Sequence, residues 1–277
     1  MERKLSESLH SLNNEVTVLT DEATGERFVA RRPNGRTADA LGIRRTKEAI
    51  ALRAAGLHPA PRAMTPDGLL LTPFIESAGA WTGSRWTGSH AAKGYDLVRR
   101  LLGCPAPEGV PSTVERLGRM LDSVGDPGRF GIERGQIQTT LAEIGAERAE
   151  DDRYERSLAH HDLWANNIID HGDRLWLVDF EFAGGADGWF DLATVVAEGG
   201  FDERGTVDFL RAVGRSGDSE DLRALRQGTW LFHVFEMLWG AIMAERREDR
   251  RLGGERFDYA GHARRIACDL AGLQQNV

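Results

Sequence analysis

The sequence predicts an α+β fold in two lobes, a small β-rich N-terminal lobe and a larger, mostly helical C-terminal lobe. Two observations support this prediction. Short β-type segments separated by turn residues fill the start of the chain, and apolar residues at helical spacing dominate most of the remainder. A connection between Pro73 and Gly88 separates the two parts. We therefore expect an N-lobe at residues 1–76 and a C-lobe at residues 77–277.

The N-lobe is predicted to contain three strands and one helix. Residues 15–19 and 27–30 have the composition of strands, and residues 21–25 between them are turn formers. A helix is expected over residues 38–55, because Gly56 and two prolines follow it closely. Residues 68–74 are expected to form a third strand that ends at a proline.

The C-lobe is predicted to be built mainly from helices. Ser112 and Glu115 have the spacing of a capping box, which predicts a helix that continues to about residue 124. Further helices are expected over residues 133–149, 190–198, 220–248 and 258–273.

Composition limits the classes of function. The 277 residues carry a net charge of −8 without a long basic run, which argues against nucleic acid or an anionic membrane as partner and favours a cationic substrate. No apolar run is long enough to span a membrane. The polar start has no signal-peptide core, and the chain has only two cysteines. We expect a cytoplasmic protein with free thiols.

The most informative motif begins at His160. Asp162 follows two residues later, Asn167 follows Asp162 by five residues, and Asp179 opens a Asp-Phe-Glu triplet. This order and spacing is typical of a phosphoryl-transfer site, in which the first Asp accepts a hydroxyl proton and the Asn and second Asp hold metal. The plainer alternative is a polar loop whose Asp and Asn residues cap turns.

A predicted hairpin strengthens the functional interpretation. Residues 168–169 and 175–178 are short apolar runs on either side of a polar turn. Pairing of these runs would place Asn167 and Asp179 at the same end of the hairpin. Two predicted metal ligands that lie apart in sequence would then face one site.

Several motifs together resemble those of the aminoglycoside phosphotransferase and choline kinase superfamily, whose members have a protein-kinase-like fold. The matching segments are residues 28–31, 44–48, 160–167, 179–181, 189–193 and 257–260. The resemblance covers nearly the whole chain and implies an enzyme that uses Mg²⁺ and ATP or GTP. It also implies that Asp191 braces the catalytic loop, although a helix N-cap is an alternative role, and that His160 braces the loop.

The resemblance further implies a nucleotide site in the N-lobe. Arg31 would grip the phosphates and Glu48 would fix Arg31 through an ion pair. Alternation along the strand would point the neighbouring Arg32 to the opposite face. Ser11 and Asn13 lie where the family has its phosphate-binding turn, but this stretch has no glycine and departs from the family pattern there.

The acceptor site is expected to combine carboxylates with aromatic rings. Glu181 has two interpretations, a second metal site or a contact with a cationic substrate. The other predicted substrate-binding residues are Trp164, Glu236, Trp239 and Tyr259. Glu236 stands where choline kinases have Trp, and Phe182 stands where they often have Tyr, which leaves choline itself in doubt. The plain alternative for the segment around Trp239 is a buried helix stripe.

These observations predict a kinase that transfers the γ-phosphoryl group of ATP or GTP to a hydroxyl of a small cationic molecule. A choline- or ethanolamine-type amino alcohol is the leading acceptor, and an antibiotic phosphotransferase is the main alternative. Thiamine or glycan-type acceptors also remain open. An alternative of another class is a catalytically silent pseudokinase that only binds nucleotide or amine, although Asp162, Asn167 and Asp179 together argue against it.

Overall fold

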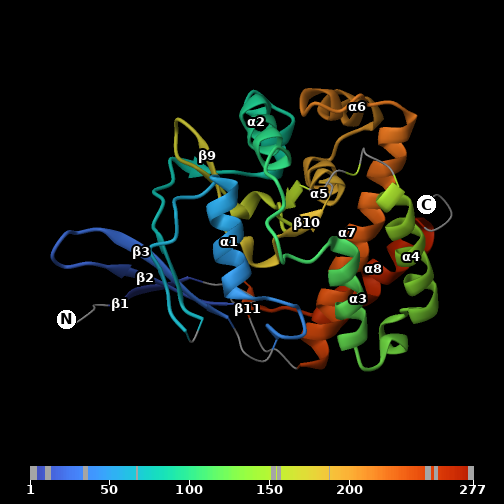
Figure 1. Cartoon of the computed structure of the whole chain (residues 1–277), viewed down its shortest axis with the longest axis horizontal. Helices are drawn as coiled ribbons and strands as arrows, with labels where there is room; N and C mark the ends of the chain where they lie inside the picture. The colour runs from blue at the N-terminus through green and yellow to red at the C-terminus, as the bar shows by residue number, and fades with distance from the viewer. Residues whose placement is uncertain are drawn as a thin grey trace.

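The two lobes of the molecule are a strand-rich N-terminal part and a larger helical part (Figure 1). The structure, a computed structural model, describes residues 5–9, 14–33, 37–66, 68–150, 154, 157–186, 188–246, 251–252 and 255–273. The predicted α+β architecture is confirmed. The boundary at residues 76 and 77 stays a prediction.

The N-terminal part is built on a five-stranded antiparallel sheet. Its strands are β1 (Leu5–Leu9), β2 (Asn14–Thr20), β3 (Arg27–Pro33), β4 (Ala63–Met64) and β5 (Leu70–Pro73), in the order β1-β2-β3-β5-β4. The three predicted strands correspond to β2, β3 and β5, whereas β1 and β4 were not predicted. Asp21 closes the β2–β3 turn by accepting the N–H of Ala23 at 2.8 Å, and Gly25 there has φ of 73°.

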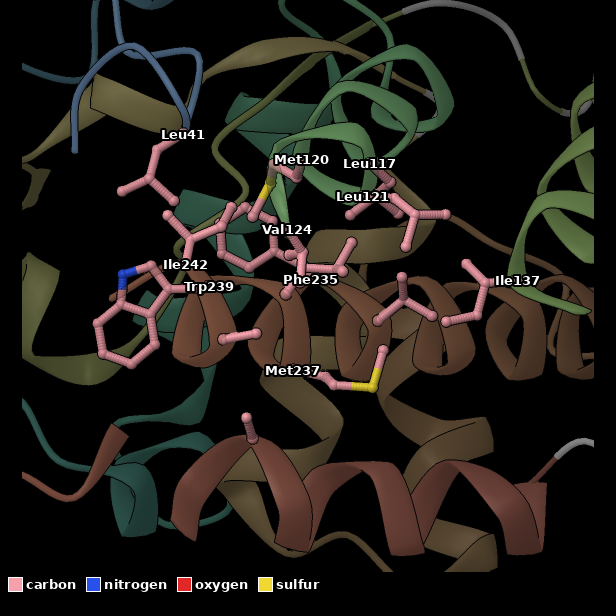
Figure 2. Close-up of a cluster of buried hydrophobic side chains, with 14 of the residues drawn as sticks. Leu41, Leu117, Met120, Leu121, Val124, Ile137, Phe235, Met237, Trp239 and Ile242 are labelled. Atoms are coloured by element: carbon pink, nitrogen blue, oxygen red, sulfur yellow. The ribbon is translucent and has the colours of Figure 1, made fainter. Parts of the chain in front are cut away.

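Helix α1 (Arg45–Ala55) is shorter than predicted. The predicted helix of residues 38–55 is wrong over its first part, because Gly42 has φ of 69° and interrupts the helical path. The segment before α1 instead turns so that Leu41 becomes fully buried against the C-terminal helices, where it points toward Ile242 and Trp239 (Figure 2). An N-terminal residue thus joins the C-terminal core.

The larger part consists mostly of helices. The α-helices are α2 (Ala91–Leu102), α3 (Thr113–Ser123), α4 (Arg134–Glu150), α5 (Trp189–Gly199), α6 (Glu203–Ala212), α7 (Ser219–Glu245) and α8 (Tyr259–Leu273). The five helices predicted here correspond to α3, α4, α5, α7 and α8, and the capping box of Ser112 and Glu115 is present. Helices α2 and α6 were not predicted. No helix in the described ranges has the length and apolar character needed to cross a membrane.

Short elements connect the helices and carry the candidate site. The strands are β6 (Gly79–Ala80), β7 (Ser157–Ala159), β8 (Ile168–Asp170), β9 (Leu175–Leu177), β10 (Gly184–Ala186), β11 (Arg251–Leu252) and β12 (Glu255–Arg256). The 3-10 helices are η1 (Gly83–Trp86), η2 (Pro127–Phe130), η4 (Ala165–Asn167) and η5 (Phe180–Phe182). Strands β8 and β9 pair antiparallel, so the predicted hairpin is confirmed.

Helix α7 is the central element of the helical part. It lies between α3 and α8, and its side chains interdigitate with those of α3 (Figure 2). Residues Leu231, Phe235, Leu238 and Ile242 are buried at helical spacing, as the sequence predicted. Helix α7 packs closely on α5 at Gly228, in its N-terminal half, where a Cβ would lie 2.3 Å from the carbonyl oxygen of Trp189.

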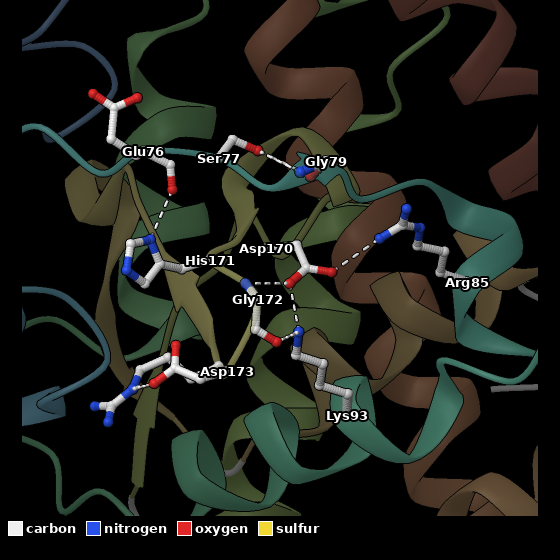
Figure 3. A network of polar contacts seen from close by, with 10 residues as sticks. Glu76, Ser77, Gly79, Arg85, Lys93, Asp170, His171, Gly172 and Asp173 are labelled. Carbon is white, nitrogen blue, oxygen red and sulfur yellow. Dashed lines mark hydrogen bonds and ion pairs between the residues drawn. The ribbon is translucent and has the colours of Figure 1, made fainter.

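A polar network fastens the β8–β9 hairpin to its surroundings (Figure 3). Asp170, the last residue of β8, accepts a hydrogen bond from Arg85 at 3.0 Å and forms an ion pair with Lys93 of α2. Lys93 also donates to the carbonyl of Gly172 in the turn at 2.9 Å, and His171 is within 2.8 Å of the Glu76 carbonyl. These contacts fix the strand that begins directly after Asn167.

Candidate active site

The loop between β7 and β8 brings Asp162 and Asn167 together. The side-chain amide of Asn167 donates to the Asp162 carboxylate at 2.7 Å and to the Asp162 backbone carbonyl at 2.8 Å. Helix η4, a single 3-10 turn that ends at Asn167, provides the curvature that turns the amide back toward Asp162. The five-residue spacing in the sequence therefore becomes a direct contact.

Asp191 holds the start of this loop from helix α5. Its two carboxylate oxygens accept the backbone N–H groups of His160 and His161 at 2.7 and 2.8 Å. The His160 ring contacts the Val178 carbonyl at 2.9 Å, which ties the loop to the end of β9. The predicted bracing by Asp191 and His160 is confirmed at the level of contacts.

His161 is a loop residue to which the sequence assigned no role. It has φ of 60°, an uncommon value for a residue with a Cβ, and it is fully surrounded by protein. Its Nδ1 lies 3.0 Å from the Phe182 carbonyl and its Nε2 lies 2.7 Å from the Thr113 hydroxyl. Burial lowers the pKa of His161 to about 3, so the ring is neutral and donates through Nδ1. His161 thus joins the catalytic loop to the segment after Asp179.

Glu198 is a second residue that sequence reasoning missed. Its carboxylate accepts the Ala165 N–H at 2.8 Å and the Trp86 indole N–H at 2.9 Å. Glu198 follows Asp191 by two helical turns, so both carboxylates project from one face of α5 toward the loop. In the sequence, the signal for Glu198 is its seven-residue spacing from Asp191 on the helix that follows the motif.

Arg31 connects the N-lobe sheet to Asp179. It forms an ion pair with Glu48 of α1, which confirms the predicted pairing, and its other guanidinium nitrogen lies 2.5 Å from the Asp179 carboxylate. Arg31 and Glu48 are 7% and 1% exposed, whereas Arg32 is exposed on the opposite face as predicted. Burial alone would lower the Arg31 pKa, but the charges of Glu48, Asp179 and Glu181 outweigh it and raise that pKa.

Asp179 has a backbone conformation that suits a functional role. It stands at the junction of β9 and η5 with φ of 63°, and its side chain is 21% exposed. An aspartate held in the left-handed region is uncommon and is often found at functional sites. Among the described residues, Asp179 and His161 are the two residues other than glycine that have a positive φ.

Negative charge concentrates around Asp162. Burial raises the pKa of the Asp162 carboxyl well above its usual range, and the carboxylates of Asp179, Glu181 and Glu236 raise it further. The hydrogen bond from Asn167 acts in the opposite direction but does not compensate. Arg31 pairs with Glu48 and Asp179 at this site and offsets part of their charge. A cationic ligand would relieve the repulsion that remains among the carboxylates around Asp162.

Asn167 and Asp179 fit the role of metal ligands. The amide nitrogen of Asn167 is turned to Asp162, so the group that the amide can still offer is its Oδ1 acceptor. Asp179 offers a carboxylate. Amide and carboxylate oxygens are donors that Mg²⁺ prefers, and Mg²⁺ commonly takes few protein ligands beside phosphate oxygens and water.

The predicted substrate residues fall into two groups. Trp239 and Tyr259 lie together, with ring centroids 5.4 Å apart, in a cluster that also contains Phe257. Both are largely buried, at 8% and 4% exposure, and the burial of Trp239 agrees with the alternative of a buried helix stripe. Trp164 is half-buried within the catalytic loop and packs on Phe232 at 5.6 Å.

The two carboxylates predicted for the acceptor site lie on η5 and α7. Glu181 is buried at 4% exposure in η5, near enough to act on the charges of Asp162 and Arg31. Glu236 projects from α7 and pairs with His262 of α8 at 3.2 Å. Ser11 and Asn13, the predicted phosphate-binding residues, lie outside the described residues.

Comparison with known proteins identifies the fold. No protein-family model matches the sequence, and no curated protein matches it. Solved structures do match: the choline kinase LicA from Streptococcus pneumoniae has 18% identity and a TM-score of 0.76, covering 99% of this chain and 95% of that one. A choline/ethanolamine kinase family protein from Mesorhizobium loti has 21% identity and a TM-score of 0.69, with coverage of 97% and 87%.

An antibiotic-modifying enzyme is similar to a lesser degree. The GDP complex of an aminoglycoside 2′-phosphotransferase-IIIa mutant has 15% identity and a TM-score of 0.61, covering 98% of this chain and 93% of that one. The chain therefore has the protein-kinase-like fold shared by choline kinases and aminoglycoside phosphotransferases, as the sequence predicted.

Proposed function

We propose that the protein is a Mg²⁺-dependent small-molecule kinase that transfers the γ-phosphoryl group of ATP or GTP to a hydroxyl of a small cationic acceptor. The observation that carries this proposal is the convergence of Asp162, Asn167 and Asp179 at one site, with Arg31 and Glu48 reaching it from the N-lobe. This is the set of groups that phosphoryl transfer requires. A cytoplasmic location, where nucleoside triphosphates are available, goes with the proposal.

The proposed mechanism assigns a task to each group. Asp162 orients the acceptor hydroxyl and takes its proton as the hydroxyl oxygen forms a bond to the γ-phosphorus and the bond to the β-phosphate oxygen breaks. Asn167 keeps the Asp162 carboxylate in place through its hydrogen bond. Asn167 and Asp179 would hold Mg²⁺, which supplies charge neutralisation on the phosphates when bound.

Arg31 is proposed to bind the nucleotide phosphates. Its ion pair with Glu48 fixes the guanidinium at the inner face of the sheet, and its contact with Asp179 brings it to the carboxylate proposed to hold the metal. Phosphate oxygens are good bidentate partners for a guanidinium. Ser11 and Asn13, which precede β2 in the sequence, are proposed to contribute further phosphate contacts.

The acceptor is proposed to be an amino alcohol of the choline or ethanolamine type. The negative charge of Asp162, Glu181 and Glu236 favours a cation, and the rings of Trp164, Trp239 and Tyr259 suit its apolar parts. A second candidate is an aminoglycoside or another antibiotic, which the likeness to the aminoglycoside phosphotransferase fold supports and which an acidic site would also serve.

A phosphorylation screen tests the proposal. Purified protein with Mg²⁺ and either ATP or GTP is offered choline, ethanolamine, thiamine, neutral sugars and aminoglycosides, and phosphorylated product is identified by mass spectrometry. Product from an amino alcohol, absent with Asp162→Asn, is the expected result. If nucleotide binds with Mg²⁺ but its γ-phosphoryl group is transferred neither to any acceptor nor to water, the kinase proposal is rejected in favour of the pseudokinase alternative.

A further inference from the structure

Glu236 is the end of a polar arrangement that bridges α7 and α8, and His262 is its middle. His262 approaches it with Nε2 at 3.2 Å from a carboxylate oxygen, and Arg265 approaches His262 with a guanidinium nitrogen 2.9 Å from Nδ1. Arg265 follows His262 by one helical turn on α8. The sequence pattern gave no role to either residue.

Hydrogen-bond chemistry fixes the direction of this chain. A guanidinium has only donors, so the Nδ1 atom that faces Arg265 acts as acceptor. The ring proton of His262 then sits on Nε2 and is donated to Glu236, whose ionised carboxylate can only accept. Donation runs from Arg265 to His262 to Glu236, and the same contact that orients the ring selects its tautomer.

The packing of the two helices supports this arrangement. Gly240 lies one turn after Glu236 on α7, and a Cβ there would stand 3.1 Å from a carbon of the His262 ring and 3.0 Å from the Tyr259 carbonyl. The missing side chain lets α8 come close enough for His262 to reach Glu236. The ring is also held by edge contact with Trp239, at 5.8 Å between centroids.

The hydrogen bond between His262 and Glu236 is largely shielded from water. The side chains of His262 and Glu236 are 13% and 16% exposed, so water replaces this contact poorly. Glu236 nevertheless acts on the charge of Asp162, which places its carboxylate within electrostatic reach of the catalytic residue. A carboxylate in that position is useful to a cationic acceptor only if its rotamer is fixed.

We infer that Arg265, His262 and Glu236 form a hydrogen-bond relay that positions the Glu236 carboxylate toward the acceptor, which makes His262 a specificity-determining positioning residue. The inference rests on the proposed function, because it assigns Glu236 to the cationic group of the acceptor. A fixed carboxylate with oxygen atoms directed at the acceptor favours an ammonium group that donates hydrogen bonds, as in a primary amine, over a quaternary one.

The tautomer of His262 tests the relay without any substrate. Nitrogen-15 NMR of the full chain should show the His262 proton on Nε2 and a bare Nδ1, and Arg265→Ala should change the Nδ1 signal whereas Arg264→Ala should not. Arg264 is an exposed neighbour on the same helix and serves as the matched control. A proton on Nδ1 in the unaltered protein would overturn the relay.

Steady-state kinetics test its effect on the acceptor, with ethanolamine and choline as probes. His262→Ala should raise the KM for ethanolamine about tenfold, the scale of one lost hydrogen bond to a charged group, with kcat and the nucleotide KM unchanged. His262→Gln, which retains a donor, should restore most of the affinity. His233→Ala is the matched control, because His233 lies on α7 but bonds the Thr229 carbonyl of its own helix.

A double-mutant cycle separates positioning from simple destabilisation. In a Glu236→Gln background, His262→Ala should add little to the ethanolamine KM, and the choline KM should change less than the ethanolamine KM throughout. Additive losses, or equal losses for both probes, would overturn the inference. Phosphorylation of neither probe with the Nε2 tautomer intact would instead reject the proposed acceptor class and leave the relay standing.

Discussion

At the residue scale, Asp162 is proposed to act as the base, and burial and the neighbouring carboxylates destabilise its ionised form. We expect Asp162→Asn and Asp179→Ala each to lower kcat by about a thousandfold or more while the protein stays folded, since both side chains are proposed to serve the reaction and neither belongs to the hydrophobic core. Product formation from the best acceptor, followed beside circular dichroism, measures this. Near-normal turnover in either folded variant would remove that residue from its assigned role.

The raised pKa of Asp162 makes a prediction about pH. Because the pKa is higher in the folded protein than the usual value of about 3.9, the folded state binds the proton more tightly than the unfolded chain. Ionised Asp162 therefore costs stability, and this cost appears as pH rises through the unfolded value and is complete above the folded pKa.

Asp162→Asn should accordingly raise the Tm of the metal-free protein at pH 8, with a gain that shrinks as pH falls toward about 4. The activity of the unaltered enzyme should change in the same direction and decline as pH falls through the Asp162 pKa, because the base must be ionised. Thermal melts and kcat/KM measured over the same pH series check both. A Tm gain that is independent of pH would contradict the electrostatic origin.

Arg31 and Arg32 form a natural matched pair. Arg31→Ala should raise the nucleotide KM about tenfold or more with a smaller effect on the acceptor KM, because it removes the cation proposed for the phosphates. Arg32→Ala should have little effect, since its side chain is exposed on the other face of β3. Equal effects of the two substitutions would show that the nucleotide site is misplaced.

At the element scale, Gly228 and Gly118 allow the effect of close helix packing on stability to be compared with the effect of helix propensity. Gly228 brings α7 against the Trp189 backbone, whereas a Cβ at Gly118 of α3 would meet nothing within 4 Å. Gly118→Ala should therefore stabilise the protein by roughly 0.5–1 kcal/mol through helix propensity. Gly228→Ala should destabilise it by roughly 1–3 kcal/mol because the helices must separate. Denaturant unfolding of both variants measures the difference, and the same sign for both would contradict the packing argument.

The elements themselves show how far local pattern reaches. Helix α3 follows from its capping box and the β8–β9 hairpin from its apolar runs and polar turn. The start of α1 does not follow from local pattern. Gly42 interrupts the helical path before it, and Leu41 packs into the hydrophobic core of the helical part. Local composition describes the segment, and burial against a distant helix decides its path.

At the scale of the whole molecule, charge is the property that bears on function. The net charge of −8 and the carboxylates around Asp162 predict that a cationic acceptor is attracted at long range. Its kcat/KM should fall by several-fold as ionic strength rises from about 0.01 to 0.15 M, over which the Debye length shrinks from about 30 to 8 Å. A neutral polyol offered as acceptor should show no such dependence.

The salt dependence of kcat/KM is measured from initial rates at several salt concentrations, with a neutral osmolyte as the control for crowding. Efficient phosphorylation of neutral polyols, with every amino alcohol ignored, would leave the fold unchanged but would reject the cationic acceptor class.

Several parts of the protein follow from short-range sequence pattern. These include the two-lobed fold and the hairpin after the loop of Asp162, which periodicity and turn chemistry predict. Five residues separate Asp162 from Asn167, and the hairpin turns the chain back so that Asp179 lies at the same end as Asn167. The Arg31–Glu48 pair was reached through resemblance and then seen in the structure.

The distant groups that support the site become visible in the folded structure. His161 meets Thr113, Glu198 meets Ala165, and His262 meets Glu236 across 26 residues of chain. The spacing of acidic residues on α5 marks Glu198, but no local pattern gives the partner in any of these contacts, because each depends on how closely two helices or loops approach. Close packing fixes that approach, and it is set by residues such as Gly240 that carry no chemistry of their own.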